Sequence, residues 1–375
     1  MNTALKYTVA LAALSLAAQA APFLAVGDNA ELFLTGTLGI RADDNVLLSN
    51  NKKSDIIYQV SPGLDLVFGN NALTKGHLFY KLTSDRYSDH SILDTNLSSI
   101  GFTSAYDDQK LKMNLDASFD QLAQNTVDTV IPNGDSFARR DLFKVSGGSE
   151  ISMTEKSSIG AGVSYDDTKY IKSGFDDSKI TTIPVNFFYE VTPKVDMSFG
   201  FRYRDTKLTT GSDSRDAFYS IGARGEFTPK LSGTLAVGYT QRTFSKNIDS
   251  ESTPGIDTSL TYAASEKTSI RFGVSNDYGV SGTGATQRNM SYNFGVQSKL
   301  SEEWSTGFTL SYRSIAYLGT GSRTDKYFEG GLNATYMINA VVSVVGGYTY
   351  RNNDSALAGS SFNNSVFSLS ANFRY

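Results

Sequence analysis

The chain of 375 residues contains no cysteine, so neither a disulfide nor a thiolate metal site can stabilise its fold. Its two histidines, His77 and His90, are too few for a metal cluster, and no set of carboxylates has the spacing of metal ligands. The sequence has no run of basic residues and a formal net charge of only −4, which excludes a typical nucleic-acid-binding surface. We therefore expect no cofactor, no metal and no nucleic-acid partner.

Glycine and aromatic residues are abundant instead, with 33 Gly, 23 Phe and 21 Tyr against only 7 Pro. This composition favours long β-strands. Between Val195 and Arg204 the residues alternate between apolar or aromatic and polar or small, and Lys112 to Asp120 alternates in the same way. A period of two places the two sets on opposite faces of a strand.

Short polar turns recur along the chain at intervals of about 36 to 38 residues, with one interval of about 47. They begin at Asn70, Asp107, Thr154, Thr192, Thr228, Ser265, Ser301 and Asn339. A looser polar connection divides each interval, so each repeat is a hairpin of two strands. The pattern predicts an all-β fold, a transmembrane antiparallel up-and-down β-barrel of about 18 strands.

Both termini fit a barrel in the bacterial outer membrane. The first twenty residues carry one cation, Lys6, then an apolar stretch from Val9 to Ala18 that is well short of the roughly 20 residues of a transmembrane helix. Ala18, Gln19 and Ala20 then fit a cleavage site, so we predict a signal peptide at 1–20 and a barrel at 21–375. The chain ends in an alternating strand with Phe373 and Tyr375, which predicts a C-terminal signal for the barrel-assembly machinery.

A large soluble β-sandwich is the alternative fold, because it too would alternate along its strands. It would have to account separately for the leader-like segment, the hairpin period and the aromatic end. Trp304 and Tyr312 are expected on one outward face, as in the aromatic girdles of outer-membrane barrels. Such a barrel has lipid and lipopolysaccharide as its surroundings, and its apolar outer face would also permit a homo-oligomer.

Charged residues are predicted to face the lumen. The early strands contribute Asp85, Asp116 and Asp120. The middle and later strands contribute Arg202, Arg204, Arg224, Arg242, Arg271, Arg313 and Arg351. If the two groups line opposite walls, a solute crosses a transverse field. Alternatively the charges pair with neighbours, for example Arg224 with Glu226 or Asp216.

One connection is exceptionally long, Gln121 to Ala138 after the fifth predicted strand, and it includes Val127, Val130, Ile131 and Pro132. A partly apolar loop needs something to pack against. In general diffusion porins it is the third external loop, also after strand five, that folds inward. This loop is therefore a candidate constriction, and the alternative is a longer surface loop.

Catalysis would have to use His77 or His90, the second of which lies close in sequence to Asp85 and Asp89. An outer-membrane protease or lipase pairs a histidine with a carboxylate or serine. Isolated histidines in a chain of this length do not define such a site. We expect the protein not to be an enzyme, with an outer-membrane hydrolase as the least favoured alternative.

The predicted strand count, the compact loops, the step Ser61, Pro62, Gly63, Leu64 and the final Asn372 to Tyr375 resemble the family called putative β-barrel porin 2. The barrel itself predicts a channel for passive diffusion of small hydrophilic solutes through a charged lumen. The resemblance implies an alternative, an exit pore for secreted polysaccharide that works with periplasmic export proteins. Phe79, Phe188 and Tyr327, expected to face inward, could stack on sugars.

Overall fold

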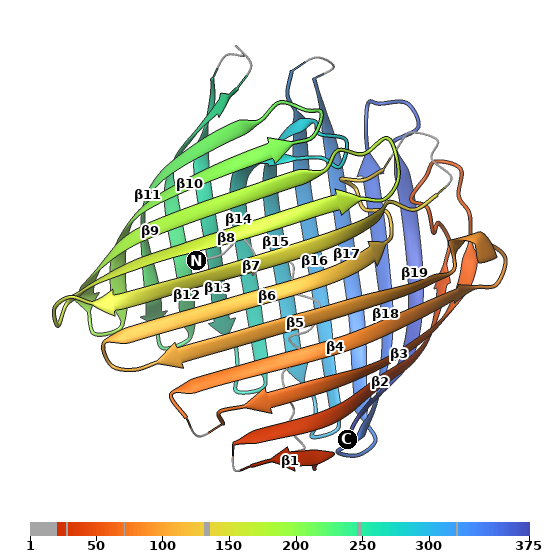
Figure 1. The fold of residues 1–375 in the computed structure, drawn as a ribbon, viewed down its shortest axis with the longest axis horizontal. Helices are drawn as coiled ribbons and strands as arrows, with labels where there is room; N and C mark the ends of the chain where they lie inside the picture. The colour runs from red at the N-terminus through yellow and green to blue at the C-terminus, as the bar shows by residue number, and fades with distance from the viewer. Residues whose placement is uncertain (1–20, 28, 71, 131–135, 246–249, 320–321) are drawn as a thin grey trace.

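The computed structural model describes residues 21–27, 29–70, 72–130, 136–245, 250–319 and 322–375. They form one antiparallel sheet that closes on itself as a barrel (Figure 1). Eighteen long strands make the ring, as the turn pattern predicts, and a short strand β1 (Leu24–Val26) pairs with the first of them. The ring strands are β2 (Ala30–Asp43), β3 (Asp55–Phe68), β4 (Thr74–Tyr87), β5 (Thr95–Asp107), β6 (Leu111–Ala123), β7 (Arg139–Ser152), β8 (Ser157–Tyr170), β9 (Ser178–Thr192), β10 (Val195–Leu208), β11 (Ser214–Thr228), β12 (Leu231–Phe244), β13 (Glu251–Ala263), β14 (Thr268–Val280), β15 (Thr286–Lys299), β16 (Trp304–Tyr317), β17 (Arg323–Met337), β18 (Val342–Asp354) and β19 (Phe362–Arg374).

The last strand closes the ring against the first long strand. β19 pairs with β2 from Val366 opposite Asp43 to Arg374 opposite Thr35. Tyr375 continues this pairing, because its backbone exchanges two hydrogen bonds with Leu34. Every long strand therefore has a partner on both sides, and the sheet has no free edge to aggregate.

One end of the barrel has tight turns and the other has longer loops. β9 ends at Thr192 and β10 begins at Val195, so only two residues join them at the turn end. The opposite, loop end carries a 3₁₀ turn (Ser91–Leu93) in the connection between β4 and β5. Across the residues that the structure describes, no helix is long and apolar enough to span a bilayer.

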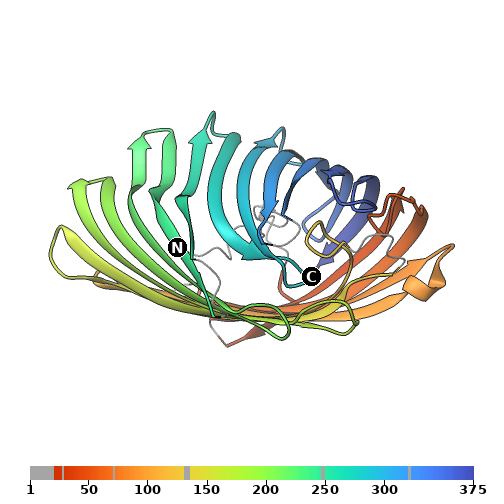
Figure 2. The same cartoon turned by 90° about the horizontal axis from the view of Figure 1, so that it is seen from above.

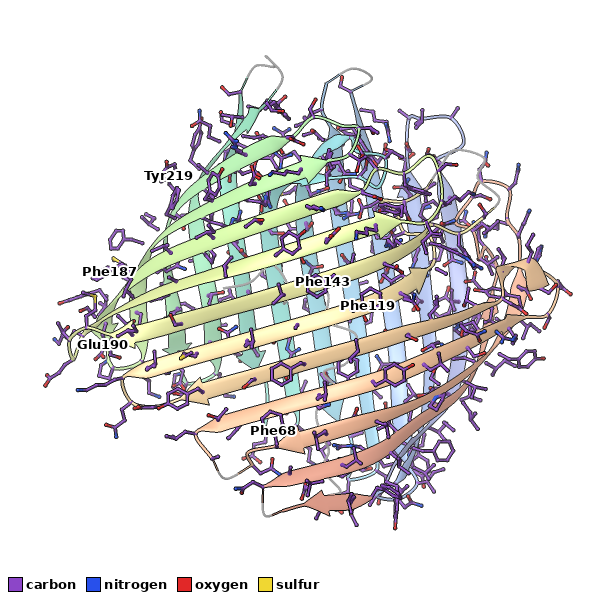
Figure 3. The ribbon with its side chains drawn as sticks, viewed as in Figure 1. Phe68, Phe119, Phe143, Phe187, Glu190 and Tyr219 are labelled. Atoms are coloured by element: carbon purple, nitrogen blue, oxygen red, sulfur yellow. The ribbon has the colours of Figure 1, made fainter. Side chains whose placement is uncertain are left out.

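The strands present an apolar outer face and a polar inner face, as their alternation predicts. On β10, Met197 and Phe199 are 46% and 50% exposed on the outside. Figure 3 shows Phe143, Phe187 and Tyr219 on the outside of the wall. A closed sheet with apolar side chains on its outside is stable only in apolar surroundings such as the lipid bilayer. The outer face is therefore the membrane face. Trp304 and Tyr312 also lie on this face, as predicted.

Candidate channel lumen

The loop between β6 and β7, residues 124–138, folds into the barrel. We call it the third loop; residues 131–135, which include Ile131 and Pro132, lie outside the described part of the chain. Val127 is buried against Ile315 and Tyr317, which are on the inner face of β16. β16 is on the far side of the ring from β6 and β7 (Figure 2). The third loop therefore crosses the lumen, as expected for a constriction loop.

Polar bonds fix the third loop to the far wall. The Asp128 carboxylate accepts hydrogen bonds from Arg313 at 2.9 Å and from Gln287 at 3.4 Å. The Asp128 carbonyl accepts a further bond, 2.7 Å long, from the backbone N–H of Gly282, in the loop between β14 and β15. Asp128 thus joins the third loop to β15, β16 and the adjoining loop.

The loop between β2 and β3, residues 44–54 and here called the first loop, folds inward beside the third. Leu47 packs with Phe137 of the third loop, and Leu48 packs in the same cluster as Val127. Asn45 is fully buried and donates hydrogen bonds to the carbonyls of Ser49 and Asn363. Two buried apolar clusters, each with residues of both the first and the third loop, therefore join these loops inside the loop end of the barrel.

Leu48 has a backbone φ of +51°, and it is the one non-glycine residue with a positive φ among the described residues. A branched aliphatic residue pays a steric cost in this left-handed conformation. Here the cost is offset by the burial of its side chain among Val127, Ile315 and Phe362.

Six of the seven predicted lumen arginines form ion pairs. Arg242 and Arg204 share Asp216, and Arg204 also binds Asp277 at 3.1 Å. Arg242 and Asp216 are each only 2% exposed. The remaining pairs are Arg202 with Asp277, Arg224 with Glu150 and Asp196, Arg313 with Asp128, and Arg351 with Glu329. The lumen is thus charged, but most of its positive charge is neutralised locally.

Arg224 reaches beyond its neighbouring strand. Its guanidinium donates two hydrogen bonds to Glu150 of β7, at 2.8 and 2.6 Å, and one to Asp196 of β10. Its planar group also stacks on the ring of Phe188, 3.4 Å from the centroid. Asp196 is directly opposite Arg224 in the ladder between β10 and β11, whereas Glu150 is on the more distant strand β7, so the partners are not the suggested Glu226 or Asp216. One face of the Phe188 ring, which was expected to stack on sugars, is therefore covered by the Arg224 guanidinium.

The loop-end part of β14 separates from β13. The ladder between the two strands ends at Ile256 opposite Asn276, although both strands continue beyond it. The Arg204 and Arg242 guanidinium groups instead donate hydrogen bonds to the carbonyls of Tyr278 and Gly279 on β14. An arginine clamp therefore replaces backbone pairing in this part of the wall.

The other predicted charges have simpler surroundings. Asp85 accepts hydrogen bonds from Arg41 at 2.6 Å and from Gln59 at 3.0 Å. Asp116 accepts one from Asn114, and Asp120 lies on the same inner face of β6. Arg271 is exposed on β14, and within the described residues it has no recorded ion pair.

The two histidines do not assemble a catalytic group. His90 lies at the loop end, where its Nδ1 is 2.8 Å from Oδ2 of Asp55. Asp55 also accepts backbone N–H bonds from Ser88, Asp89 and His90, so the pair holds the connection between β4 and β5 in place. His77 is at the turn end beside Asp65 and stacks on Phe79.

A closed antiparallel barrel with an apolar outer face, a charged lumen and an inward-folded third loop defines the porin class of outer-membrane proteins. The chain belongs to the putative beta-barrel porin 2 family, whose model matches residues 21–375. This membership places it in the outer membrane. No curated protein matches the sequence.

Three solved structures resemble this chain over most of its length. OpdL of Pseudomonas aeruginosa is 11% identical over 93% of this chain and 99% of its own, with a TM-score of 0.50. OpdK of the same organism is 8% identical over 92% and 99%, with a TM-score of 0.48. OccAB2 of Acinetobacter baumannii is 9% identical over 93% and 96%, with a TM-score of 0.49. The likeness to OpdL, at this identity, shows a shared fold alone.

Sequence reasoning did not single out Asp128 or Glu150, although both hold lumen arginines. Their partners lie 185 and 74 positions away along the chain. The one available signal for Asp128 was its place in the exceptional loop. Asp196, Asp216 and Asp277 could be recognised as inward acids from the alternation alone, but not as partners of particular arginines.

Proposed function

We propose that the protein is a passive channel for small hydrophilic solutes, narrowed at its loop end by the first and third loops. The third loop carries this proposal, because Val127 and Asp128 contact the opposite wall rather than solvent. A barrel of this strand number encloses an aqueous passage, and an inward loop sets the width of that passage.

The extensive pairing of lumen arginines supports a channel with modest preference between ions. A passing solute meets each ion pair as a dipole. The electric field of a dipole decays faster with distance than the field of a free charge. A passage lined in this way suits neutral and weakly charged polar solutes. No energy source or cofactor is required for such diffusion.

Conductance across a planar bilayer tests the proposal. The purified full-length barrel is expected to give steady ohmic openings without added partners. A silent protein that conducts only after addition of a periplasmic export partner would support the polysaccharide-exit alternative, which the comparisons do not favour.

The hydrolase alternative has a separate test. We expect H77A and H90A variants to conduct like the wild type and the protein to release no product from ester or peptide substrates. A hydrolytic activity that disappears in either variant would contradict the channel assignment.

We also propose that the barrel-assembly machinery recognises Phe373 and Tyr375. Both are exposed on the outer face at the turn end, where a factor in the periplasm can reach them.

The predicted signal peptide, residues 1–20, lies outside the described residues, and N-terminal sequencing of the mature protein is expected to begin at Ala21. Chemical crosslinking in intact cells tests for the predicted oligomer.

A further inference from the structure

Basic side chains crowd the outer face of five neighbouring strands at the loop end. They are Arg139 on β7, Lys169 on β8, Lys179 on β9, Lys207 on β10 and Arg215 on β11. All five are exposed, and the strand alternation places them on the face that carries the membrane-facing aromatic residues. We call them the basic rim.

Two members of the basic rim face each other directly. In the ladder between β9 and β10, Lys179 is paired with Lys207, so both ammonium groups occupy one spot on the outer face. Like charges opposite one another destabilise a sheet unless an anion lies between them. Within the described residues, neither lysine has a recorded ion pair.

Acidic residues on the same face neutralise only part of the basic rim. Asp141, Asp167 and Asp205 lie directly opposite Lys169, Lys179 and Arg215 in the strand ladders. Of these three, Asp205 is held by Arg215 at 3.2 Å, an exposed contact of little energetic weight. Five bases and three acids leave this patch with excess positive charge.

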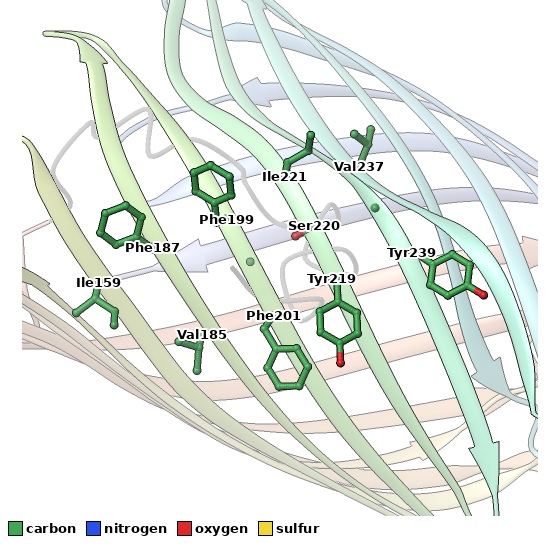
Figure 4. Close-up of a pocket in the computed structure, with 12 residues that line it drawn as sticks. Ile159, Val185, Phe187, Phe199, Phe201, Tyr219, Ser220, Ile221, Val237 and Tyr239 are labelled. Carbon is green, nitrogen blue, oxygen red and sulfur yellow. The ribbon is translucent and has the colours of Figure 1, made fainter.

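A hollow lies below the basic rim on the same strands, towards the turn end. It has a volume of about 530 Å³ and opens on the outer face of β8 to β12 (Figure 4). Its lining is largely apolar and includes Ile159, Val185, Phe201, Tyr219, Val237 and Tyr239. An apolar hollow in a membrane-facing wall fits a hydrocarbon chain.

The separation between the basic rim and the hollow matches a lipid. Arg215 and Tyr219 are four residues apart on β11, and Lys207 and Phe201 are six apart on β10. At about 3.3 Å per residue these intervals span roughly 13 to 20 Å. A lipid headgroup and the acyl chain beneath it extend over a similar length.

We propose that the outer face of β8 to β11 binds a phosphorylated lipid of the outer leaflet. Its phosphate lies between Lys179 and Lys207, and an acyl chain occupies the hollow. The phosphate removes the repulsion between the two ammonium groups and accepts charge-assisted hydrogen bonds from them. This site depends on the outer-membrane location and not on the proposed transport function.

The double variant K179Q/K207Q tests the headgroup contact. Native mass spectrometry of the detergent-solubilised full chain would measure retention of lipid A and of dephosphorylated lipid A. We expect the wild type to hold the phosphorylated form at least about tenfold more tightly, and the double variant to lose this preference. The matched control is R288Q/K326Q, which neutralises outward bases at the loop end of β15 and β17. Equal binding by both variants would overturn the proposal.

A hollow-filling variant, V237W, tests the acyl chain. We expect weaker retention of lipid A, while the temperature at which the barrel unfolds in a heated gel stays that of the wild type. Inorganic phosphate at millimolar concentration is expected not to displace the lipid. Full displacement by phosphate, or unchanged binding in V237W, would show a simple anion site and overturn the lipid assignment.

Discussion

The lumen arginines illustrate how much a residue's role depends on its partners. Arg242 and Arg271 have the same alternation signal in the sequence, yet Arg242 is buried in an ion-paired cluster and Arg271 is exposed to the lumen. The first is a structural residue of the wall. The second is an accessible charge for passing ions.

Replacing Arg242 with methionine should destabilise the barrel by about 3 to 5 kcal/mol, because the largely buried Asp216 then loses a partner. Thermal unfolding followed by circular dichroism measures this loss. The control K194Q removes an exposed pair with Glu226 and should leave the transition unchanged. Similar shifts in both variants would contradict a structural role for the Arg242 cluster.

Replacing Arg271 with glutamate should shift ion preference towards cations, because a charge facing the lumen acts on ions within about 10 Å at 0.1 M salt. The reversal potential in a salt gradient measures this change. R288E, on the outer face of the adjacent strand β15, is the control. An unchanged potential in R271E would show that the residue lies away from the ion path.

At the scale of elements, strands and turns follow from the sequence and inward loops do not. Residues on one strand interact with immediate neighbours, so a period of two and a recurring turn suffice to place Thr192 and Thr228 at strand ends and Ser301 in a turn. The contact between Val127 and Ile315 joins opposite walls. No local pattern encodes it, although the apolar residues of the third loop indicated that it packs somewhere.

The contact between Asp128 and Arg313 should keep the third loop docked against the opposite wall of the barrel. In D128R the new charge repels Arg313, and loss of an interaction of about 1 kcal/mol shifts the balance between docked and undocked loop about fivefold. Single-channel recordings should then show larger and noisier conductance. The charge-swapped double variant D128R/R313D should restore the wild-type current. If the double variant conducts like D128R, the pair does not hold the loop.

At the scale of the whole molecule, the number of strands could be predicted from the repeated hairpins. The closure of the ring could be predicted because, in a membrane, the backbone hydrogen-bonding groups of the first and last strands need each other as partners. The contacts that bridge β14 to its neighbours could not be predicted. Arg204 and Arg242 reach the carbonyls of Tyr278 and Gly279, which requires the curvature of the finished barrel.

Removing the aromatic rings of Phe373 and Tyr375 should lower the amount of barrel in the outer membrane, because the assembly machinery loses its proposed signal. Quantified envelope fractions of F373A/Y375A measure this effect. The control F367A/L369A removes two outward side chains from the same strand. Both proteins should refold alike in detergent micelles. Equal levels in cells would contradict the signal.

Where the β13–β14 ladder stops, the barrel has a seam fastened by side chains instead of a row of amide bonds. These guanidinium groups are largely buried, so dissolved salt screens them little. A row of amide bonds forms whatever the side chains are, whereas this seam depends on the identity of two residues. Substitutions at Arg204 and Arg242 can therefore alter one corner of the rim while the backbone pairing of the other strands stays as it is.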